Sequence, residues 1–311
     1  MHHIEQEVHL ASRTNVSVLL QGETGVGKDY LAYIIHTGSN WRKGPFVSIN
    51  VSAVPDQLFE SELFGHEKGA FTGAVHPKPG LIEVASGGTL LLNEVGDIPW
   101  ASQAKLLSYL DSGHYFRVGG VTRRRTQARI ISATNGNLLE AVERKQFRGD
   151  LYFRLAGITI RIPPVRERSD VAELVSELCL ELARKKGMGN APGIDPEALH
   201  ILVHHPWPGN VRQMKHCLEL ALSSCDGQCI KREDLHFFAC GCLASDHGDD
   251  QSLTAVVTIL PGQSLKEALD AAKAELVTKA LEEAGGSLAE AARLLGISRD
   301  ALKYLRRVKG E

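Results

Sequence analysis

The feature that most constrains the fold is a short apolar run that leads directly into a glycine-rich loop. Residues 16–21 read VSVLLQ, and the loop GETGVGKD follows at 22–29. Leu31, Ile34 and Ile35 then repeat at the spacing of one helix face. A strand, a glycine loop and a helix in this order begin an α/β unit, which predicts a parallel sheet covered by helices.

Further elements continue this alternation along the first half of the chain. Strands are predicted at 46–49, 89–92, 128–133 and 157–162. Helices are expected between several of them, for example at 101–112. The alternation stops at Pro163 and Pro164, after which 169–186 and 195–224 are predicted to be helical. A helical subdomain is therefore expected to follow the sheet.

The glycine loop matches the pattern G-x-x-x-x-G-K, with Asp29 where Ser or Thr is usual. Its successive backbone N–H groups, backed by a helix N-terminus, form a cradle for phosphate. Lys28 is expected to reach the β- and γ-phosphates of a nucleotide. The residues predicted to bind the nucleotide are Gly22, Glu23, Thr24, Gly25, Val26, Gly27, Lys28 and Asp29.

The stretch GGTLLLNEVGD supplies the second element of a nucleotide site, an apolar strand that ends in polar residues. Glu94, at the end of this strand, can polarise a water for attack on the γ-phosphate. Asn93 stands where an Asp would ordinarily help to hold the hydration shell of Mg²⁺. Its amide oxygen can accept a hydrogen bond from a metal-bound water but brings no charge. Asn93 and Asp29 are the predicted contacts to Mg²⁺, through water.

Composition places the chain among ordinary globular proteins and limits its partners. The formal net charge of −2 gives no overall basic signal, so any contact with nucleic acid must be local. No apolar run approaches the roughly 20 residues that span a bilayer. The first ten residues lack the features of a signal peptide. We therefore expect a cytoplasmic protein with no membrane partner and with reduced cysteines.

Four cysteines cluster beyond the predicted helices, at Cys225, Cys229, Cys240 and Cys242, with Cys217 nearby. Their spacing is not a standard zinc pattern. Small, partly buried thiols beside a linker are the simpler interpretation, and a metal-binding or redox role stays open as the alternative.

The C-terminal residues GGSLAEAARLLGISRDALKYLRR predict two short helices around a tight turn. Ser287 and Glu290 form a capping box that begins the first helix, and Gly296 allows the turn. A basic outer face on the second helix fits entry into the major groove of DNA. The residues predicted to contact DNA are Ser298, which caps that helix, and Arg299, Lys303, Arg306 and Arg307.

These patterns divide the chain into four predicted parts. They are an α/β nucleotide-binding subdomain (1–163), a helical lid (164–238), a linker (239–262) and an all-α helix-turn-helix domain (263–311). The linker lacks periodicity and is locally acidic.

Five motifs together resemble one family. GETGVGKD, ESELFGHEKGAFTGA, GGTLLLNEVGDIP, FRGDLYFRL and WPGNVRQMKH occur in the order seen in bacterial enhancer-binding proteins, the AAA+ activators of sigma-54 RNA polymerase. The resemblance extends from residue 4 to about residue 308, and the GAFTGA loop is close to diagnostic. It implies an AAA+ fold with a helical lid and a Fis-type DNA-binding domain.

The resemblance also implies roles for individual residues. ATP hydrolysis with Mg²⁺ would occur between the subunits of a ring, expected to be a hexamer, and the C-terminal domain would dimerise on enhancer DNA. Phe71 and Thr72 would touch sigma-54 within the loop formed by Gly69, Ala70, Phe71, Thr72, Gly73 and Ala74. The implied catalytic set adds a switch that hydrogen-bonds Glu94, a first sensor, two arginine fingers and a second sensor, namely Asn50, Asn135, Arg148, Arg154 and Arg212.

Three points stay open at the level of sequence. Asn93 favours, as the alternative function, a DNA-binding regulator with the same fold and weak or absent ATPase activity. Phe71 could instead be buried and fix a turn. Arg123, Arg124 and Arg125 are expected at a hairpin tip, where a solvated position is the simpler interpretation and a contact with DNA or the ring pore is the alternative.

Overall fold

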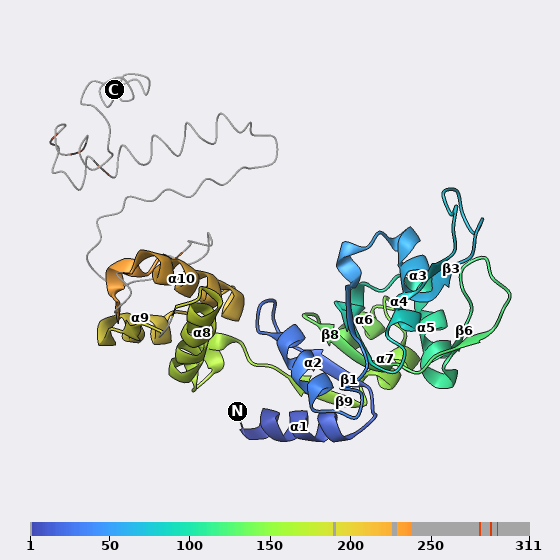
Figure 1. Ribbon diagram of the computed structural model, residues 1–311, viewed down its shortest axis with the longest axis horizontal. Coiled ribbons are helices and arrows are strands. Elements are labelled where there is room, and N and C mark those ends of the chain that lie inside the picture. Colours follow the sequence, from blue (N-terminus) through green and yellow to red (C-terminus); the bar gives the residue numbers. More distant parts are fainter. Residues whose placement is uncertain are drawn as a thin grey trace. The chain divides into compact units, whose positions relative to one another are not determined.

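The computed structural model describes residues 2–188, 191–225 and 229–237, together with Ala280, Ser287 and Ala291. The chain divides into two compact units, Met1–Cys240 and Gly241–Glu311. Figure 1 shows the ribbon of the first unit, in which a sheet carries helices on both faces. No helix among the described residues is long and apolar enough to cross a membrane.

The central sheet of the first unit is entirely parallel. Its five strands run in the order β2 (Phe46–Asn50), β5 (Thr89–Asn93), β8 (Arg129–Thr134), β1 (Val18–Gln21) and β9 (Ile158–Arg161). The β8 strand is buried along its whole length, as expected for a strand with helices on both sides. All five predicted strands are confirmed, with ends within two residues of the predicted ones.

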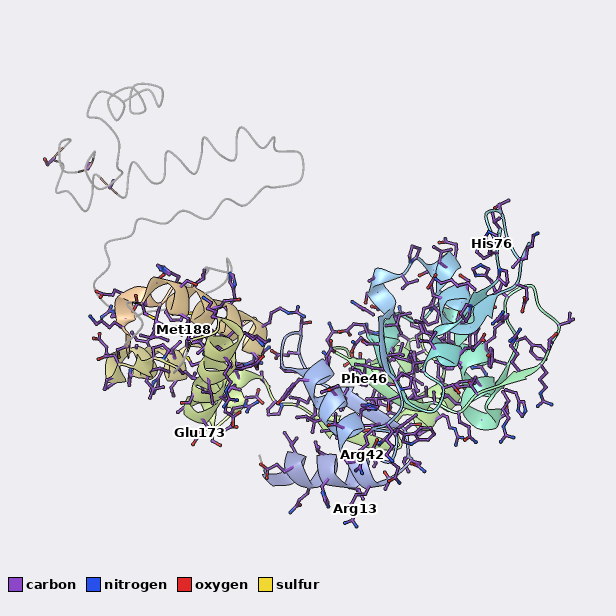
Figure 2. All side chains as sticks on the ribbon, viewed as in Figure 1. Arg13, Arg42, Phe46, His76, Glu173 and Met188 are labelled. Carbon is purple, nitrogen blue, oxygen red and sulfur yellow. The ribbon has the colours of Figure 1, made fainter. Side chains whose placement is uncertain are left out.

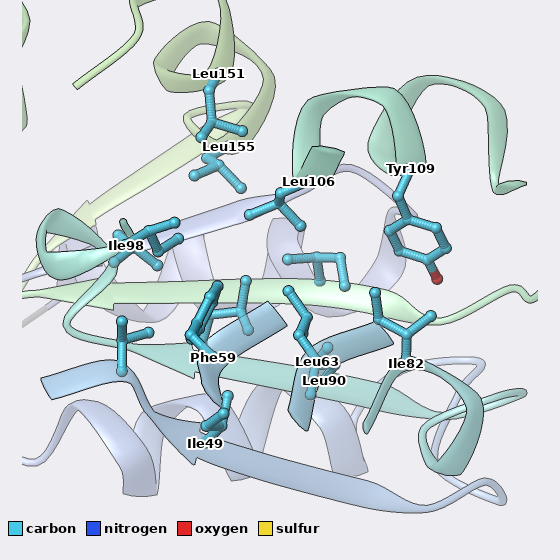
Figure 3. Packing of buried hydrophobic residues seen from close by; sticks show 14 of the residues in the cluster. Ile49, Phe59, Leu63, Ile82, Leu90, Ile98, Leu106, Tyr109, Leu151 and Leu155 are labelled. Carbon is cyan, nitrogen blue, oxygen red and sulfur yellow. The ribbon is translucent and has the colours of Figure 1, made fainter. Parts of the chain in front are cut away.

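Alternation of side chains along the strands produces a separate core on each face of the sheet. On one face, Leu20 and Ile131 pack with residues of α1 (His2–Arg13) and α2 (Lys28–Thr37). On the other face, Leu90 and its neighbours pack against residues of five helices. These helices are α3 (Asp56–Phe64), α4 (Leu81–Val84), α5 (Trp100–Ser112), α6 (Leu138–Glu143) and α7 (Gly149–Leu155). Figure 3 shows part of this packing, around Phe59, Leu106 and Leu155.

Two short antiparallel hairpins extend the α/β part. The first pairs β3 (Gly65–His66) with β4 (Lys78–Pro79), and the second pairs β6 (His114–Tyr115) with β7 (Arg124–Arg125). Figure 2 shows His76 on the loop that projects between β3 and β4. Short 3-10 turns follow several strands, at η1 (Val51–Ala53), η2 (Val95–Asp97), η3 (Val165–Glu167) and η4 (Arg232–Asp234).

The helical lid has its own core around Trp207, which is fully buried. It consists of α8 (Val171–Lys185), α9 (Pro196–His204) and α10 (Asn210–Ser224), with the short parallel strands β10 (Gly193–Ile194) and β11 (Cys229–Ile230). The predicted helical range 195–224 is in fact two helices. Pro206 and Pro208 lie between them, and proline disfavours helical backbone both at itself and at the preceding residue.

Most of the predicted linker and helix-turn-helix domain lies outside the described residues. This includes all five predicted DNA contacts, Ser298, Arg299, Lys303, Arg306 and Arg307, as well as Cys240 and Cys242. Ala280 and Ala291 are helical and buried, and the Ala291 N–H donates to the Ser287 carbonyl at 3.0 Å. A bond of this kind is the first one expected in a helix capped by Ser287.

The packing on the α5 side of the sheet generates a stability prediction. Leu106 of α5 is fully buried in the core shown in Figure 3. Leu106→Ala should lower the free energy of unfolding by about 2–5 kcal/mol, because it removes buried apolar surface and leaves a cavity. The measurement is urea unfolding followed by circular dichroism. Leu139→Ala is the matched control, since Leu139 is 47% exposed and should change stability by less than about 0.5 kcal/mol. Equal effects of the two substitutions would contradict the described packing.

Candidate nucleotide-binding site

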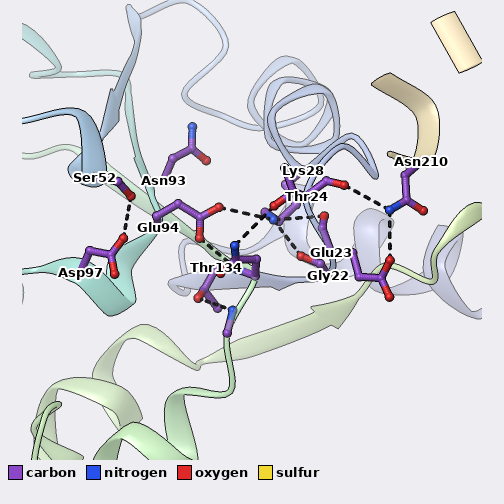
Figure 4. Close-up of polar contacts among 12 residues, drawn as sticks. Gly22, Glu23, Thr24, Lys28, Ser52, Asn93, Glu94, Asp97, Thr134 and Asn210 are labelled. Atoms are coloured by element: carbon purple, nitrogen blue, oxygen red, sulfur yellow. Dashed lines mark hydrogen bonds and ion pairs between the residues drawn. The ribbon is translucent and has the colours of Figure 1, made fainter. Parts of the chain in front are cut away.

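The glycine loop connects the end of β1 to the start of α2 and holds the side chain of Lys28. The Lys28 ammonium donates to the carbonyl oxygens of Gly22 at 2.7 Å and Glu23 at 3.3 Å. Its Nζ also lies 3.7 Å from Oε1 of Glu94. Figure 4 shows these contacts. Lys28 is only 8% exposed, so the loop wraps around a nearly buried cation.

The electrostatic surroundings of Lys28 suit an anion. Burial lowers the pKa of the ammonium, and the carboxylates of Glu94 and Asp29 act in the opposite direction. The positive charge of Arg212 lowers it further. A desolvated ammonium close to a second cation is stabilised by an added negative group, such as a phosphate.

The backbone of the loop leaves room for that group. Gly27 caps α2 with a left-handed backbone, at φ 100°, and a Cβ built there would meet no atom within 4 Å. Since the N–H groups at a helix start have no partner within the helix, this open face is a ready anion site. Gly25 is also left-handed, but a Cβ there would collide with the Gly209 carbonyl of the lid.

Glu94 and Asn135, the residue that the family resemblance implies to be the first sensor, meet beside the loop. The Asn135 N–H donates to Oε2 of Glu94 at 3.0 Å, and the Asn135 amide donates to the hydroxyl of Thr24 at 3.3 Å. Glu94 has a left-handed backbone at φ 54°, which is unusual for a residue other than glycine. Strain of this kind at a polar site is commonly retained for function.

The structure does not join Asn50 to Glu94. Asn50 ends β2 in register with Asn93, yet no hydrogen bond links it to the Glu94 carboxylate within the described residues. The carboxylate is instead directed toward Lys28 and Asn135. The predicted switch contact is therefore absent here, because the turn at Glu94 takes its side chain to the other neighbours.

Asn93 makes one weak contact and leaves one atom unsatisfied. Its amide nitrogen donates to the Ser48 hydroxyl at 3.4 Å. Its Oδ1 is buried and accepts no hydrogen bond from any described residue. A buried acceptor without a partner is rare in folded proteins, so this oxygen is available to a ligand or a water.

The two predicted arginine fingers lie at the two ends of α7, Arg148 as the residue that precedes the helix and Arg154 in its last turn. Arg148 pairs with Asp150 at 2.8 Å, and Arg154 pairs with Asp111 at 3.1 Å and donates to a backbone carbonyl. Both are at least one-third exposed. Within the part of the chain that the structure describes, no hydrogen bond or ion pair connects either one to Lys28 or Glu94, so neither reaches the site in cis.

The lid contacts the glycine loop through residues that the sequence did not single out. Asn210 donates to Glu23, and Arg166 forms a two-point ion pair with the same carboxylate, with one N–O distance of 2.9 Å. The hydrogen bonds from Arg166 and then Asn210 lower the Glu23 pKa to about 2. The backbone N–H of the predicted sensor Arg212 donates to the Gly25 carbonyl at 3.2 Å, and its side chain is exposed. Asn210 stands two residues before Arg212 in the motif GNVR, and its place in this motif was the sequence signal that could have identified it.

The predicted contact loop is an ordered turn with an exposed aromatic residue. Phe71 is 40% exposed, and its ring packs edge-on against His66 with centroids 5.0 Å apart. Gly69 donates to the Ala74 carbonyl at 2.8 Å, and Ala74 donates to the Phe71 carbonyl at 3.0 Å. The interpretation of Phe71 as a buried residue is wrong.

An ion-pair cluster ties the base of this loop to the second hairpin. Arg117 donates twice to Glu83 at 2.8 Å and lies 3.3 Å from Glu67. Arg124 also contacts Glu67, at 3.1 Å. The prediction of a solvated position is therefore wrong for Arg124, which is half-buried because two carboxylates face it. Arg123 and Arg125 are exposed. The Arg117 hydrogen bonds lower the pKa of Glu83.

A phosphate-binding loop after a central parallel strand, a carboxylate at the end of a neighbouring strand and a helical lid define an AAA+ P-loop NTPase fold. Three family matches agree with this class. Residues 1–161 match the sigma-54 interaction domain, 166–240 match the AAA+ ATPase lid domain, and 268–306 match the Fis family of bacterial regulatory proteins. The chain belongs to the sigma-54 interaction domain family, and the resemblance inferred from its motifs is confirmed.

The chain is also similar to individual proteins. It is 41% identical to the Nif-specific regulatory protein of Azotobacter vinelandii over 98% of this chain and 56% of that protein. It is 38% identical to the nitric oxide reductase transcription regulator NorR1 of Cupriavidus necator, over 96% of this chain and 60% of that protein. NtrX of Brucella abortus, crystallised with ADP, matches with a TM-score of 0.72 and 30% identity over 100% of this chain and 67% of NtrX. The chain spans less than two-thirds of the length of the two regulators.

The ion-pair cluster generates a prediction about the projecting loop. Arg117→Ala removes both bonds to Glu83 and one to Glu67, and leaves Arg124 as the cation that still faces the two carboxylates. Backbone amides of residues 67–77 should exchange with deuterium about tenfold faster, because the base of the loop loses partly buried ion pairs. Arg123→Ala is the control, since Arg123 is exposed and should leave exchange unchanged. Unchanged exchange in Arg117→Ala would show that the cluster does not order the loop.

Proposed function

We propose that this chain is the ATPase and DNA-binding portion of a transcriptional activator that uses ATP to remodel sigma-54 RNA polymerase holoenzyme. The observation that carries the proposal is the meeting of Lys28, Glu94 and Asn135 at one sheet edge in a chain that also projects an exposed Phe71. Residues 1–163 would bind the nucleotide, 164–238 would form the lid, 239–262 would link, and 263–311 would bind enhancer DNA.

ATP would lie along the glycine loop, with its phosphates on the open backbone face at Gly27 and on the Lys28 ammonium. Crystal structures of the similar NtrX contain ATP and ADP. Residues 22–29 would supply most of the contacts. Arg212 would sense the nucleotide from the lid, since its charge already acts on Lys28.

Mg²⁺ fits the residues at this site. The orphaned Oδ1 of Asn93 can accept from a metal-bound water, and Asp29 adds an exposed carboxylate near Lys28. A bound Mg²⁺ would neutralise charge that develops on the β- and γ-phosphates. Because Asn93 is neutral, the site attracts the cation less strongly than one with an Asp at this position.

Hydrolysis would depend on Glu94 as the group that orients and polarises the attacking water. Asn135 fixes one oxygen of this carboxylate through its backbone N–H, and its amide lies beside Thr24 of the phosphate loop. Asn50 would serve as the switch in another nucleotide state. The presence of Lys28, Glu94 and Asn135 together argues against a regulator that never hydrolyses ATP.

Arg148 and Arg154 would complete the site of a neighbouring copy in a ring, which we propose is a hexamer. Both pair with acids outside the glycine loop, and both are exposed enough to meet a partner. A guanidinium suits this role because its planar fork spreads charge over phosphoryl oxygens. The helix-turn-helix match at 268–306 supports DNA binding and dimerisation by the C-terminal domain.

The loop from Gly69 to Ala74 would press on sigma-54. Hydrolysis at Glu94 would change the position of this loop relative to the ring, and Phe71 would make the contact. Its side chain is 40% exposed and its ring packs edge-on against His66, so part of its surface is available to a partner.

The first test of the function is a steady-state ATPase assay with Mg²⁺ titration. Glu94→Ala should lower kcat at least about 100-fold, because it removes the group that orients the water. Asn93→Asp should lower the Mg²⁺ concentration needed for half-maximal activity, because it adds a charge at the orphaned acceptor. Asn137→Asp, at an exposed helix cap, is the control and should behave as wild type. Wild-type turnover equal to the Glu94→Ala background would favour the regulator without hydrolysis.

The second test separates hydrolysis from its mechanical use. Phe71→Ala should keep ATP turnover within about threefold of wild type, since Phe71 does not touch the nucleotide site, and should abolish promoter opening by sigma-54 holoenzyme. Opening is followed by permanganate reactivity of unpaired thymines. Leu139→Ala, which also truncates an exposed apolar side chain, should open promoters normally. Normal opening by Phe71→Ala would remove the loop from the proposal.

A further inference from the structure

Asn210 occupies an unusual position where the lid meets the phosphate loop. It is the first residue of α10, its side chain is fully buried, and its backbone is left-handed at φ 52°. Among residues other than glycine, Asn accepts this backbone most readily. Figure 4 shows its amide bonded to Glu23 and Thr24, two residues of the phosphate loop.

The Asn210 side chain uses every hydrogen-bonding group that faces the junction. Its Nδ2 donates to Oε2 of Glu23 and to the Thr24 carbonyl, both at 3.1 Å. Its Oδ1 accepts from the backbone N–H of Val165 at 2.9 Å. One buried amide therefore joins the phosphate loop, the segment that leads into the lid and the first turn of α10.

Arg212 of α10 and Gly209, which precedes this helix, also contact the glycine loop. The Arg212 N–H donates to the Gly25 carbonyl. The Gly209 carbonyl lies so close to Gly25 that a side chain at position 25 would collide with it. Arg166 donates a hydrogen bond to the carboxylate of Glu23. The conformation of Glu23, Thr24 and Gly25 is thus set by the lid as well as by β1 and α2.

We propose that Asn210 is a positioning residue for ATP, which holds Glu23 and Thr24 in the conformation that receives the phosphates and makes nucleotide affinity depend on the lid. This inference rests on the proposed nucleotide function and adds to it a residue that acts through the loop. A lid that rotates away would break the two donated bonds together, so the loop would lose its binding conformation as the lid opens.

Asn210→Asp tests the donated bonds selectively. It keeps the side-chain shape, the tolerance of left-handed backbone and the acceptor for Val165, but it replaces the amide donor with an oxygen that faces Glu23 and the Thr24 carbonyl. The dissociation constant of a non-hydrolysable ATP analogue, measured by calorimetry, should rise about tenfold or more. The KM for ATP should rise in parallel, while kcat should stay within about threefold.

A second substitution should reverse this effect. In the Glu23→Gln, Asn210→Asp double variant, the new amide at position 23 can donate to the new carboxylate at position 210. The double variant should therefore bind the analogue at least about fivefold more tightly than Asn210→Asp alone. Asn137→Asp makes the same chemical change at an exposed helix cap and should bind as wild type does.

The outcomes distinguish the inference from the function on which it rests. A wild-type chain that does not bind the analogue would overturn the nucleotide function itself. A wild type that binds, with unchanged affinity in Asn210→Asp or a fall in kcat at constant KM, would overturn only the role of Asn210. If circular dichroism shows that Asn210→Asp is unfolded, Asn210→Gly decides, because glycine suits the left-handed backbone and lacks the amide. It should weaken binding about tenfold, and unchanged affinity would overturn the inference.

Discussion

The register between β5, β8 and β1 is the constraint on which the site depends. Asn93 of β5 pairs with Ala133 of β8, and Thr134 pairs with Gln21 of β1. The residues that follow these pairs therefore emerge at one edge of the sheet. The Gly22 N–H donates to the Thr134 carbonyl at 3.2 Å, which fixes the start of the glycine loop beside the ends of the other strands. A slip of one residue in either pair would turn Glu94 or Asn135 to the wrong face of the sheet.

Two cores keep this register fixed. Residues of β1, β5 and β8 point alternately into the packing under α2 and into the packing under α5 (Figure 3). Thr24 and Asn135, which touch at the site, are 111 residues apart in the chain. Close packing on both faces of the sheet holds these groups from distant segments within hydrogen-bonding range. The precision of the site thus comes from the apolar core beneath it.

The parts of this arrangement that the sequence could predict are those with a local pattern. The glycine loop, the strand before it and Glu94 at the end of another strand can all be read within a dozen residues, whereas Asn135 was indicated only by the family resemblance. The contact between Asn210 and Glu23 joins positions 187 residues apart, so no local pattern contains it. The pairing of Arg124 with Glu67 was missed for the same reason. The absence of the Asn50 contact follows from the left-handed backbone at Glu94, which composition does not reveal.

The ion pairs of Arg148 and Arg154 explain how the proposed ring could assemble without a large penalty. Each guanidinium is bound to an acid of its own chain, Asp150 or Asp111, at a partly exposed position. Solvent screens exposed pairs of this kind, so exchanging one for another costs little. A guanidinium that meets a phosphate in a site closed to water forms a stronger, two-point bond. In the proposed ring, the internal acids would therefore hold the arginines in place in the free chain and would release them when a neighbouring copy brought its nucleotide within reach.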